Sequence, residues 1–192
     1  MFGWLTHALA TMCPLSDAAD RSLSRSALPI SAGLLAECLP LLGSVLYLPA
    51  RRCVTASVPQ GWLVGRGELA PLLQTRALVA STVIGADGPR EWIDCLDARG
   101  RFCARLHLLP DTDYLAWDAL LSHGCPLPDA PLRASQLICP AAHAELLHFR
   151  VRRVGTLSLL ESLPAERLSL LGCRVARDAA RAAALELMPA WA

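Results

Sequence analysis

Histidine is the residue type in this sequence best suited to bind a metal ion. The chain has five histidines, at positions 7, 107, 123, 143 and 148. His143 and His148 are five residues apart, so they would not share a helix face and do not form a chelating pair. Either of them could still serve as a single axial ligand. His107 stands in an otherwise apolar run, so it is either another candidate ligand or a histidine buried in the core.

Cysteines offer a second set of possible ligands, or a disulfide framework. There are eight, at positions 13, 38, 53, 95, 103, 125, 139 and 173, and no two are spaced as C-x-x-C. Zinc sites usually contain such close pairs. In a reducing cytoplasm, isolated cysteines behave as small apolar side chains. We therefore expect most of these residues to be buried thiols.

The charged residues exclude several function classes. All 18 basic residues are arginine, and the chain contains neither lysine nor asparagine. Schiff-base lysines, P-loop lysines and N-glycosylation sites are therefore absent. The net charge is +1 with the signs mixed along the chain, which argues against a nucleic-acid partner. No G-x-G-x-x-G, G-x-S-x-G, H-E-x-x-H or Walker sequence occurs, so the common enzyme motifs give no support to catalysis.

Length and hydropathy indicate one domain without a membrane span. The chain has 192 residues, and its apolar runs are interrupted by Pro, Gly, Arg or Glu before reaching roughly 20 residues, the length that a spanning helix needs. The apolar start of the chain has no basic residue before it, and His7 interrupts it, unlike a secretory signal. We expect a cytoplasmic protein.

The spacing of apolar and turn residues predicts a helix, then strands, then a second helix. Leucines between Ser31 and Gly43 follow a helical period, with a Ser cap and Pro40 placed to bend or end the helix. The second helix is capped within Asp111-Thr112-Asp113, has its apolar side between Tyr114 and Leu121, and is expected to end near His123-Gly124. Short apolar runs separated by turn residues lie between them, and they predict an antiparallel sheet over 45–48, 53–58, 61–64, 77–84, 91–96 and 102–109.

The two ends of the chain complete the expected architecture. Residues 1–27 read as an N-terminal arm or loosely docked helix, and 28–124 as the α+β core. The proline-rich segment 125–140 reads as a surface connection, and the remainder to 192 has helical periodicity. Together these segments predict an α+β fold, an antiparallel sheet flanked by N- and C-terminal helices packed on the same domain.

Several short motifs follow one another in a fixed order between residues 28 and 123. Leu42-Gly43-Ser44-Val45 opens a strand that leads through Arg51-Arg52 to Gly61, and a later hairpin contains Cys95 to Gly100. A strand and a helix with Trp117 follow. This order resembles the repeated half of HemS-type hemin-transport and haem-degrading proteins, which are related to the shorter ChuX and HutX haem carriers.

The resemblance implies haem as the ligand and a homodimer that rebuilds the two-half arrangement of the longer relatives. It also implies partners among the proteins of a haem-uptake system. The family's iron-binding histidine precedes a Leu-Leu pair, and the corresponding position here is Val154 or Ala165, neither of which can bind iron. His148 is the nearest replacement, so the resemblance makes it the expected metal ligand.

The remaining expected haem contacts are spread along the chain. Arg51 and Arg105 are candidates for the propionates, because guanidinium groups pair with carboxylates in a fork geometry. Tyr47 could act as a phenolate ligand, although a core or edge tyrosine is the alternative. His107 and His143 are the other candidate ligands if His148 is not the one.

Three functions remain open at this point. The first is a haem-binding or haem-trafficking protein of bacterial iron utilisation. The second is a relative that has lost haem and acts as an interaction or regulatory subunit. The third is a haem-degrading oxygenase, which the missing histidine weakens because such an enzyme needs a proximal ligand and an open distal site. The sequence therefore leans away from an enzyme.

Overall fold

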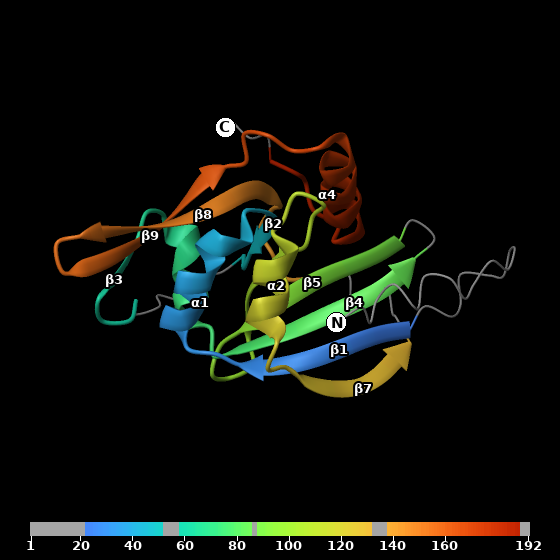
Figure 1. Cartoon of the computed structure of the whole chain (residues 1–192), viewed down its shortest axis with the longest axis horizontal. Coiled ribbons are helices and arrows are strands. Elements are labelled where there is room, and N and C mark those ends of the chain that lie inside the picture. Colours follow the sequence, from blue (N-terminus) through green and yellow to red (C-terminus); the bar gives the residue numbers. More distant parts are fainter. Residues whose placement is uncertain (1–21, 52–57, 86–87, 132–137, 189–192) are drawn as a thin grey trace, which may run out of the picture.

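The computed structural model describes residues 22–51, 58–85, 88–131 and 138–188. In this part of the chain the fold is α+β, built on one nine-stranded mixed sheet (Figure 1). The strand order is β3-β9-β8-β2-β6-β5-β4-β1-β7. The strands are β1 Ser22–Pro29, β2 Ser44–Pro49, β3 Trp62–Val64, β4 Ala77–Gly85, β5 Gly88–Leu96, β6 Phe102–His107, β7 Cys125–Pro131, β8 Glu145–Val154 and β9 Leu157–Pro164.

The helices are short, and their ends follow the local sequence. They are α1 Ala32–Cys38, η1 Leu39–Leu42, η2 Gly67–Gln74, α2 Tyr114–Leu121 and α4 Leu170–Ala182, where η denotes a 3₁₀ helix. The Ser31 side chain caps α1 by accepting a hydrogen bond from the Leu34 N–H, and Asp113 caps α2 in the same way. Pro40 lies in η1, where the regular α-helix has already ended. The predicted ends of both helices are confirmed.

One face of the sheet packs against α1, η2 and α2 to form the main core (Figure 1). Alternate residues of each strand point to this side, among them Val45 and Tyr47 of β2 and Leu147 and Phe149 of β8. Trp117 of α2 is completely buried against them. This core fixes the middle strands β8, β2, β6 and β5 in their register.

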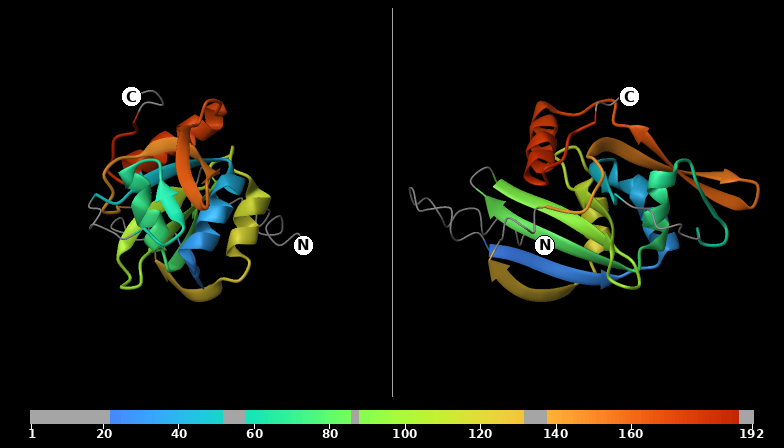
Figure 2. Two further views of the ribbon diagram at one scale, coloured as in Figure 1. Left: turned by 90° about the vertical axis from the view of Figure 1, so that its left-hand side faces the viewer. Right: turned by 180° about the vertical axis from the view of Figure 1, so that it is seen from behind.

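The opposite face of β2 belongs to a second core, to which α4 contributes. Figure 2 shows the position of α4 from two further sides. The contact is made by small side chains of α4 against Leu46 and Leu48 of β2. The alanines of α4 in this core are Ala176, Ala179 and Ala180, and Ala183 follows directly after the helix. Small residues let α4 approach the strands closely, so strand side chains that point towards α4 are buried.

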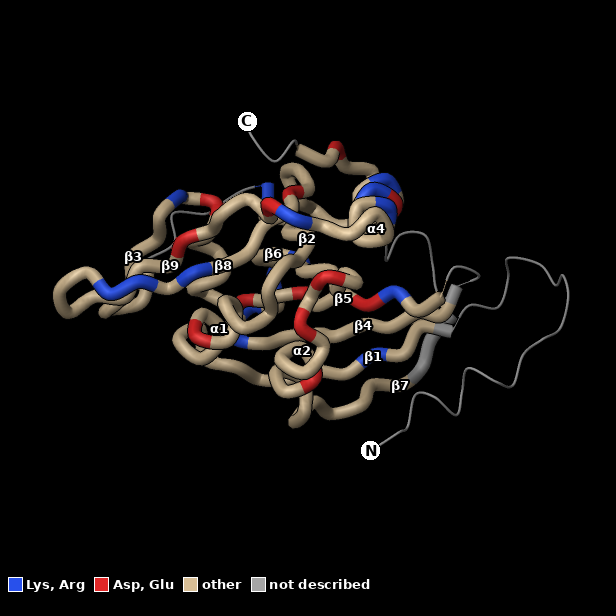
Figure 3. The backbone as a smooth tube through the Cα atoms, turned by 45° about the horizontal axis from the view of Figure 1, so that its top comes forward, with Lys and Arg blue, Asp and Glu red and all other residues tan. Residues whose placement is uncertain are grey.

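Charged residues alternate in sign on the outer elements (Figure 3). On α4, Asp178 lies 3.3 Å from Arg181 and 3.4 Å from Arg90. On the β8–β9 hairpin, Glu161 pairs with Arg150 at 2.9 Å and with Arg152 at 3.3 Å. In the part of the chain that the structure describes, no helix is long and apolar enough to cross a membrane.

The expectation of a purely antiparallel sheet is wrong. β3 pairs in parallel with β9, Trp62 opposite Ser158, although nearly a hundred residues separate them. Local turn signals reveal hairpins, but they carry no information about a pairing between such distant segments. Ser22–Pro29, most of which was expected in the N-terminal arm, forms β1 between β4 and β7. Residues 1–21 of the expected arm lie outside the described residues.

The expected C-terminal helices are mostly strands. The segment after Ala141 contains β8 and β9 before α4 begins at Leu170. Its alternation of Leu147, Phe149 and Val151 has the period of two that a half-buried strand needs. The expected connection over 125–140 also contains β7, which is an edge strand with Pro126, Pro128 and Pro131, a place where proline is tolerated.

Candidate functional site

A row of four side chains crosses the α4 side of the sheet, from β6 to β1. His107 is paired with Trp92, Trp92 with Ser81, and Ser81 with Arg25. Directly paired residues of neighbouring strands point to the same face. The pairing of His107 with Leu46 places this face on the side that packs against α4. We call Arg25, Ser81, Trp92 and His107 the polar row.

His107 is the buried end of the polar row. Its side chain is 8% exposed, and its ring lies 6.0 Å from the Trp92 ring, centroid to centroid. Burial, together with the nearby Arg105 and Arg90 charges, lowers its pKa to about 3. The imidazole is therefore neutral at physiological pH, and one ring nitrogen keeps a lone pair. The Nε2 atom has no hydrogen-bond partner.

Arg105 lies beside the polar row, and a carboxylate already occupies its guanidinium. Its Nε and Nη2 donate to the two carboxylate oxygens of Asp94, at 2.6 and 3.0 Å. The guanidinium also sits over the Trp92 ring, 5.3 Å from the centroid, where a cation–π interaction is favourable. A haem propionate at Arg105 would have to compete with Asp94.

His148 lies on the same face as His107 but on the other side of β2. It is paired with Ser44, while His107 is paired with Leu46 two residues further along that strand. The His148 side chain is partly buried. Among the described residues its ring has no hydrogen bond or ion pair, so both nitrogens remain available to a ligand.

Ser44, the residue opposite His148, is connected to the loop before α2, and that loop is connected to the start of α4. The Thr112 hydroxyl donates to the Ser44 carbonyl at 2.6 Å. The neighbouring Asp111 carboxylate accepts from the Ser169 N–H at 2.8 Å and from the Ser169 hydroxyl at 3.0 Å. The next two residues, Leu170 and Leu171, are 92% and 59% exposed. These two neighbouring leucines add apolar surface at the start of α4.

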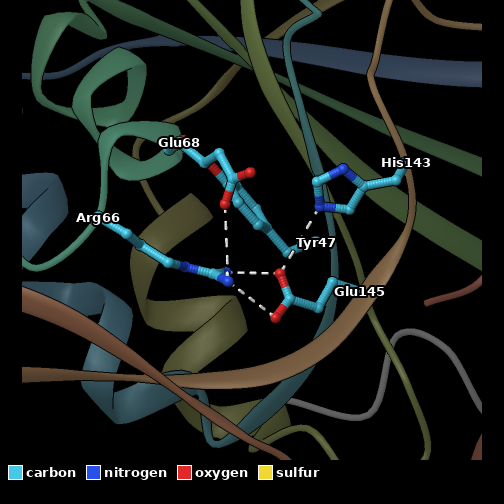
Figure 4. A network of polar contacts seen from close by, with 5 residues as sticks. All are labelled: Tyr47, Arg66, Glu68, His143 and Glu145. Carbon is cyan, nitrogen blue, oxygen red and sulfur yellow. Dashed lines mark hydrogen bonds and ion pairs between the residues drawn. The ribbon is translucent and has the colours of Figure 1, made fainter. Parts of the chain in front are cut away.

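Tyr47 points to the opposite face, into the main core (Figure 4). Its hydroxyl donates to the Glu68 carbonyl at 2.7 Å, and its ring meets Phe149 edge to face at 5.6 Å. Burial raises the Tyr47 pKa well above its ordinary value. These contacts keep the phenol protonated and give it a structural role.

His143 belongs to a separate network near Tyr47 (Figure 4). Arg66 donates through both terminal nitrogens to the two carboxylate oxygens of Glu145, one at 3.0 Å, and also lies 3.6 Å from Glu68. The His143 Nε2 is 3.8 Å from Glu145. Since the fork of Arg66 already holds Glu145, this network ties the loop before η2 to the start of β8.

Arg51 lies at the other end of β2 from His148. Its Nε donates to the Ala141 carbonyl at 2.7 Å. Ser44 and Pro49, the ends of β2, are roughly 16 Å apart at about 3.3 Å per residue. The structure thus brings His148 together with neither Arg51 nor Arg105, and it brings Tyr47 and His143 to a different face.

Trp92 and Arg25 are site residues that sequence reasoning missed. Only the register across β1, β4, β5 and β6 brings them into line with His107, and no spacing in the sequence reports it. The alternation in β5 of Trp92 and Asp94 with the apolar residues Ile93 and Cys95 is the one available signal. Within the described ranges, no three His, Cys, Asp or Glu side chains form a metal-binding group.

No family model matches the sequence, and no curated protein sequence matches it. Among solved structures, the chain is similar to that of holo-PhuS, a heme-binding protein from Pseudomonas aeruginosa, with 20% sequence identity and a TM-score of 0.36. The match covers 58% of this chain and 42% of the PhuS chain, so this chain corresponds to less than half of that protein. A likeness of this size assigns the chain to no fold family.

Proposed function

We propose that this protein binds haem and carries it, with His148 as the iron ligand. The observation that carries the proposal is the state of His148, a partly exposed imidazole without a polar partner among the described residues. Imidazole is a usual axial ligand of haem iron. The order of motifs that resembles the HemS-type family supports haem as the group to be bound. Val154 and Ala165, at the positions where that family has its histidine, supply no ligand.

We propose that exposed leucines at the start of α4 supply apolar surface for the porphyrin. Ser44, opposite His148, is linked through Thr112 to the loop that holds Ser169. Leu170 and Leu171 follow directly and are exposed. Covering such side chains contributes about 25 cal/mol per Å² of apolar area removed from water.

Arg150 is better placed to bind the propionates than Arg51 and Arg105, the two arginines expected from the sequence. Arg150 lies two residues after His148 on β8, so it points to the same face of the sheet. Its side chain is 51% exposed and contacts Glu161 at 2.9 Å. An exposed ion pair of this kind contributes little to stability and can exchange partners. We therefore propose Arg150 for the propionates, ahead of Arg51 and Arg105.

The second candidate ligand is His107. Its neutral ring and unpartnered Nε2 have the chemistry that iron needs. At 8% exposure, however, the ring is accessible only if the side chains on this face of the sheet move. A haem-free interaction module is the alternative function, and Val154 and Ala165 at the expected ligand positions favour it.

A hemin titration of the purified full chain, followed at the Soret band, tests the proposal. We expect saturation near one haem per chain and a sharp ligation spectrum, which His148→Ala should abolish. His123→Ala is the matched control, because His123 is exposed just after α2 and, among the described residues, its ring bonds only to Ser122. Size-exclusion chromatography of the same samples reports whether the protein is the expected homodimer.

The possible outcomes distinguish whether the protein binds haem from which histidine binds the iron. If His148→Ala keeps the spectrum and His107→Ala loses it, haem binding stands and His107 is the ligand. If the wild-type protein shows only a weak change that does not saturate, haem binding is wrong and the interaction module takes its place.

A further inference from the structure

Three nitrogens of the polar row are buried without any partner. They are Arg25 Nε, Trp92 Nε1 and His107 Nε2, and they account for three of the seven such side-chain atoms found among the described residues. Buried polar atoms in folded proteins are nearly always hydrogen-bonded, so each exception needs an explanation. Three exceptions in one row of four residues indicate a ligand that completes the row.

The chemistry of these nitrogens defines what the ligand must offer. The indole N–H of Trp92 and the guanidinium N–H of Arg25 can only donate hydrogen bonds. The ligand must therefore accept at two points. His107 is neutral, so its Nε2 can meet either a lone pair or a proton according to its tautomer.

The charges around the polar row favour an anion. Arg105 is paired with Asp94, and Arg90 with Asp178 of α4 at 3.4 Å. Arg25 has no ion pair with any described residue. Of these three arginines, Arg25 is therefore the one whose charge no described carboxylate balances.

We propose that the polar row binds a carboxylate, held by Arg25 Nε–H and Trp92 Nε1–H. Arg25 and Trp92 are on strands β1 and β5, roughly 10 Å apart across β4 at about 4.8 Å per strand spacing. The residue between them is Ser81, whose small side chain leaves the two longer ones free to reach over it. Arg25 is only partly buried, so part of its side chain other than Nε reaches solvent at β1.

The carboxylate has two possible sources, a free small carboxylic acid or a propionate group of a porphyrin. The second source requires the iron to be held by His107, the second candidate ligand, because His148 on β8 lies five strand spacings from Arg25 on β1. The free-acid test needs no porphyrin, so this proposal can fail or stand separately from the haem proposal. Both sources can be followed by the indole N–H resonance of Trp92 in ¹⁵N-labelled full-length protein. Trp117, which packs on the other face of the sheet, gives an internal reference in the same spectrum.

The experiment titrates three probes at constant ionic strength. They are sodium propionate, zinc protoporphyrin IX as a diamagnetic haem analogue, and the dimethyl ester of that porphyrin, which lacks carboxylates. We expect the Trp92 resonance to shift saturably with propionate, with the free-acid porphyrin, or with both, and not with the ester. Arg25→Gln should weaken that binding about ten-fold or more, as expected for loss of a charge-assisted hydrogen bond.

Arg99→Gln is the matched control, since it removes the same charge from the exposed turn before β6. A shift with propionate assigns the site to free acids, and a shift with the free-acid porphyrin alone assigns it to a porphyrin propionate. The proposal is overturned if no probe moves the Trp92 resonance, if the ester moves it equally, or if Arg25→Gln and Arg99→Gln bind alike.

Discussion

The Asp111 carboxylate fills the space beside Gly172 that a side chain at that position would need. A Cβ added to Gly172 would overlap the Asp111 Oδ2 atom. The carboxylate cannot simply move away, because it accepts hydrogen bonds from the N–H and the hydroxyl of Ser169. Ser169 in turn caps α4 by accepting from the Gly172 N–H at 2.9 Å. A carboxylate, a serine and a glycine thus fix the start of α4 on the loop before α2.

Gly172→Ala should therefore destabilise the protein, although alanine normally favours a helix by about 1 kcal/mol over glycine. We expect a loss of about 1–3 kcal/mol in the free energy of unfolding, measured by urea denaturation, from overpacking and disturbed capping. Gly33→Ala in α1 is the matched control, because its Cβ would meet only Trp62 Nε1, at 3.7 Å. In an Asp111→Ala background the penalty of Gly172→Ala should disappear, and a penalty that persists would mean that the clash is with something else.

The depressed pKa of His107 predicts a loss of stability in mild acid. Its pKa in the folded protein is about 3 against an ordinary 6.5, so the unfolded chain takes up a proton that the folded protein does not. The contribution of the neutral His107 to the free energy of unfolding is fully present above pH 6.5 and is lost as the pH falls towards 3. Between pH 7 and pH 5 the difference should be about 2 kcal/mol.

The comparison of wild type with His107→Gln isolates this effect from the carboxylates that titrate in the same range. Glutamine cannot be protonated, so the variant should lose less stability than the wild type between pH 7 and pH 5. Urea denaturation at several pH values provides the measurement. Parallel pH profiles for the two proteins would contradict a buried neutral imidazole at position 107.

Removal of Asp94 should be costly because it leaves Arg105 buried without its carboxylate. The Arg105 side chain is 5% exposed, and Asp94 holds two of its nitrogens. We expect Asp94→Ala to lower the free energy of unfolding by about 3 kcal/mol. Glu161→Ala removes a carboxylate from the exposed Arg150 and Arg152 and should change the stability little. Equal effects of the two substitutions would show that burial does not govern the Asp94 pair.

Tyr47→Phe separates a structural tyrosine from a haem ligand. The substitution removes the hydrogen bond to the Glu68 carbonyl while keeping the aromatic contact with Phe149. Stability should fall by about 1 kcal/mol. The Soret spectrum of hemin-treated protein should be unchanged, and a lost or shifted band would place Tyr47 at the iron instead.

Local rules were sufficient for much of the central region. Ser31, Pro40 and Asp113 act through their immediate neighbours, so the ends of α1 and α2 follow from a few residues of sequence. The hairpin between β5 and β6 is similar, because Asp97 accepts from the N–H groups of Arg99 and Arg101, and Gly100 adopts a positive φ of 71°. Such features do not depend on distant parts of the chain.

The prediction of helices in the C-terminal third of the chain is wrong because the local sequence favours helix while the tertiary contacts favour strands. Alanine and leucine are common there and favour helix, yet β8 forms a strand because β2 and β9 both pair with it. Pairing with β2 is a contact between residues a hundred positions apart. Tertiary contacts of this kind override weak helical propensity.

The candidate site shows the same limit. His107 and His148 could be selected as single residues, but nothing in the sequence shows that they flank β2 on one face. The alignment of Arg25 and Trp92 with His107 requires the register of three strand pairs at once. A one-residue slip in any of them would send a side chain to the other face.

The outer strands of the sheet limit how copies of this protein can associate. β3 is three residues long, and β7 carries three prolines, which have no N–H to offer to another strand. Short and proline-containing edges resist the main-chain docking from which fibres grow. At high protein concentration these edges therefore oppose the joining of sheets from neighbouring molecules edge to edge. A homodimer, or any other complex, would have to be recognised through side chains on the faces and helices, where single substitutions can switch it on or off.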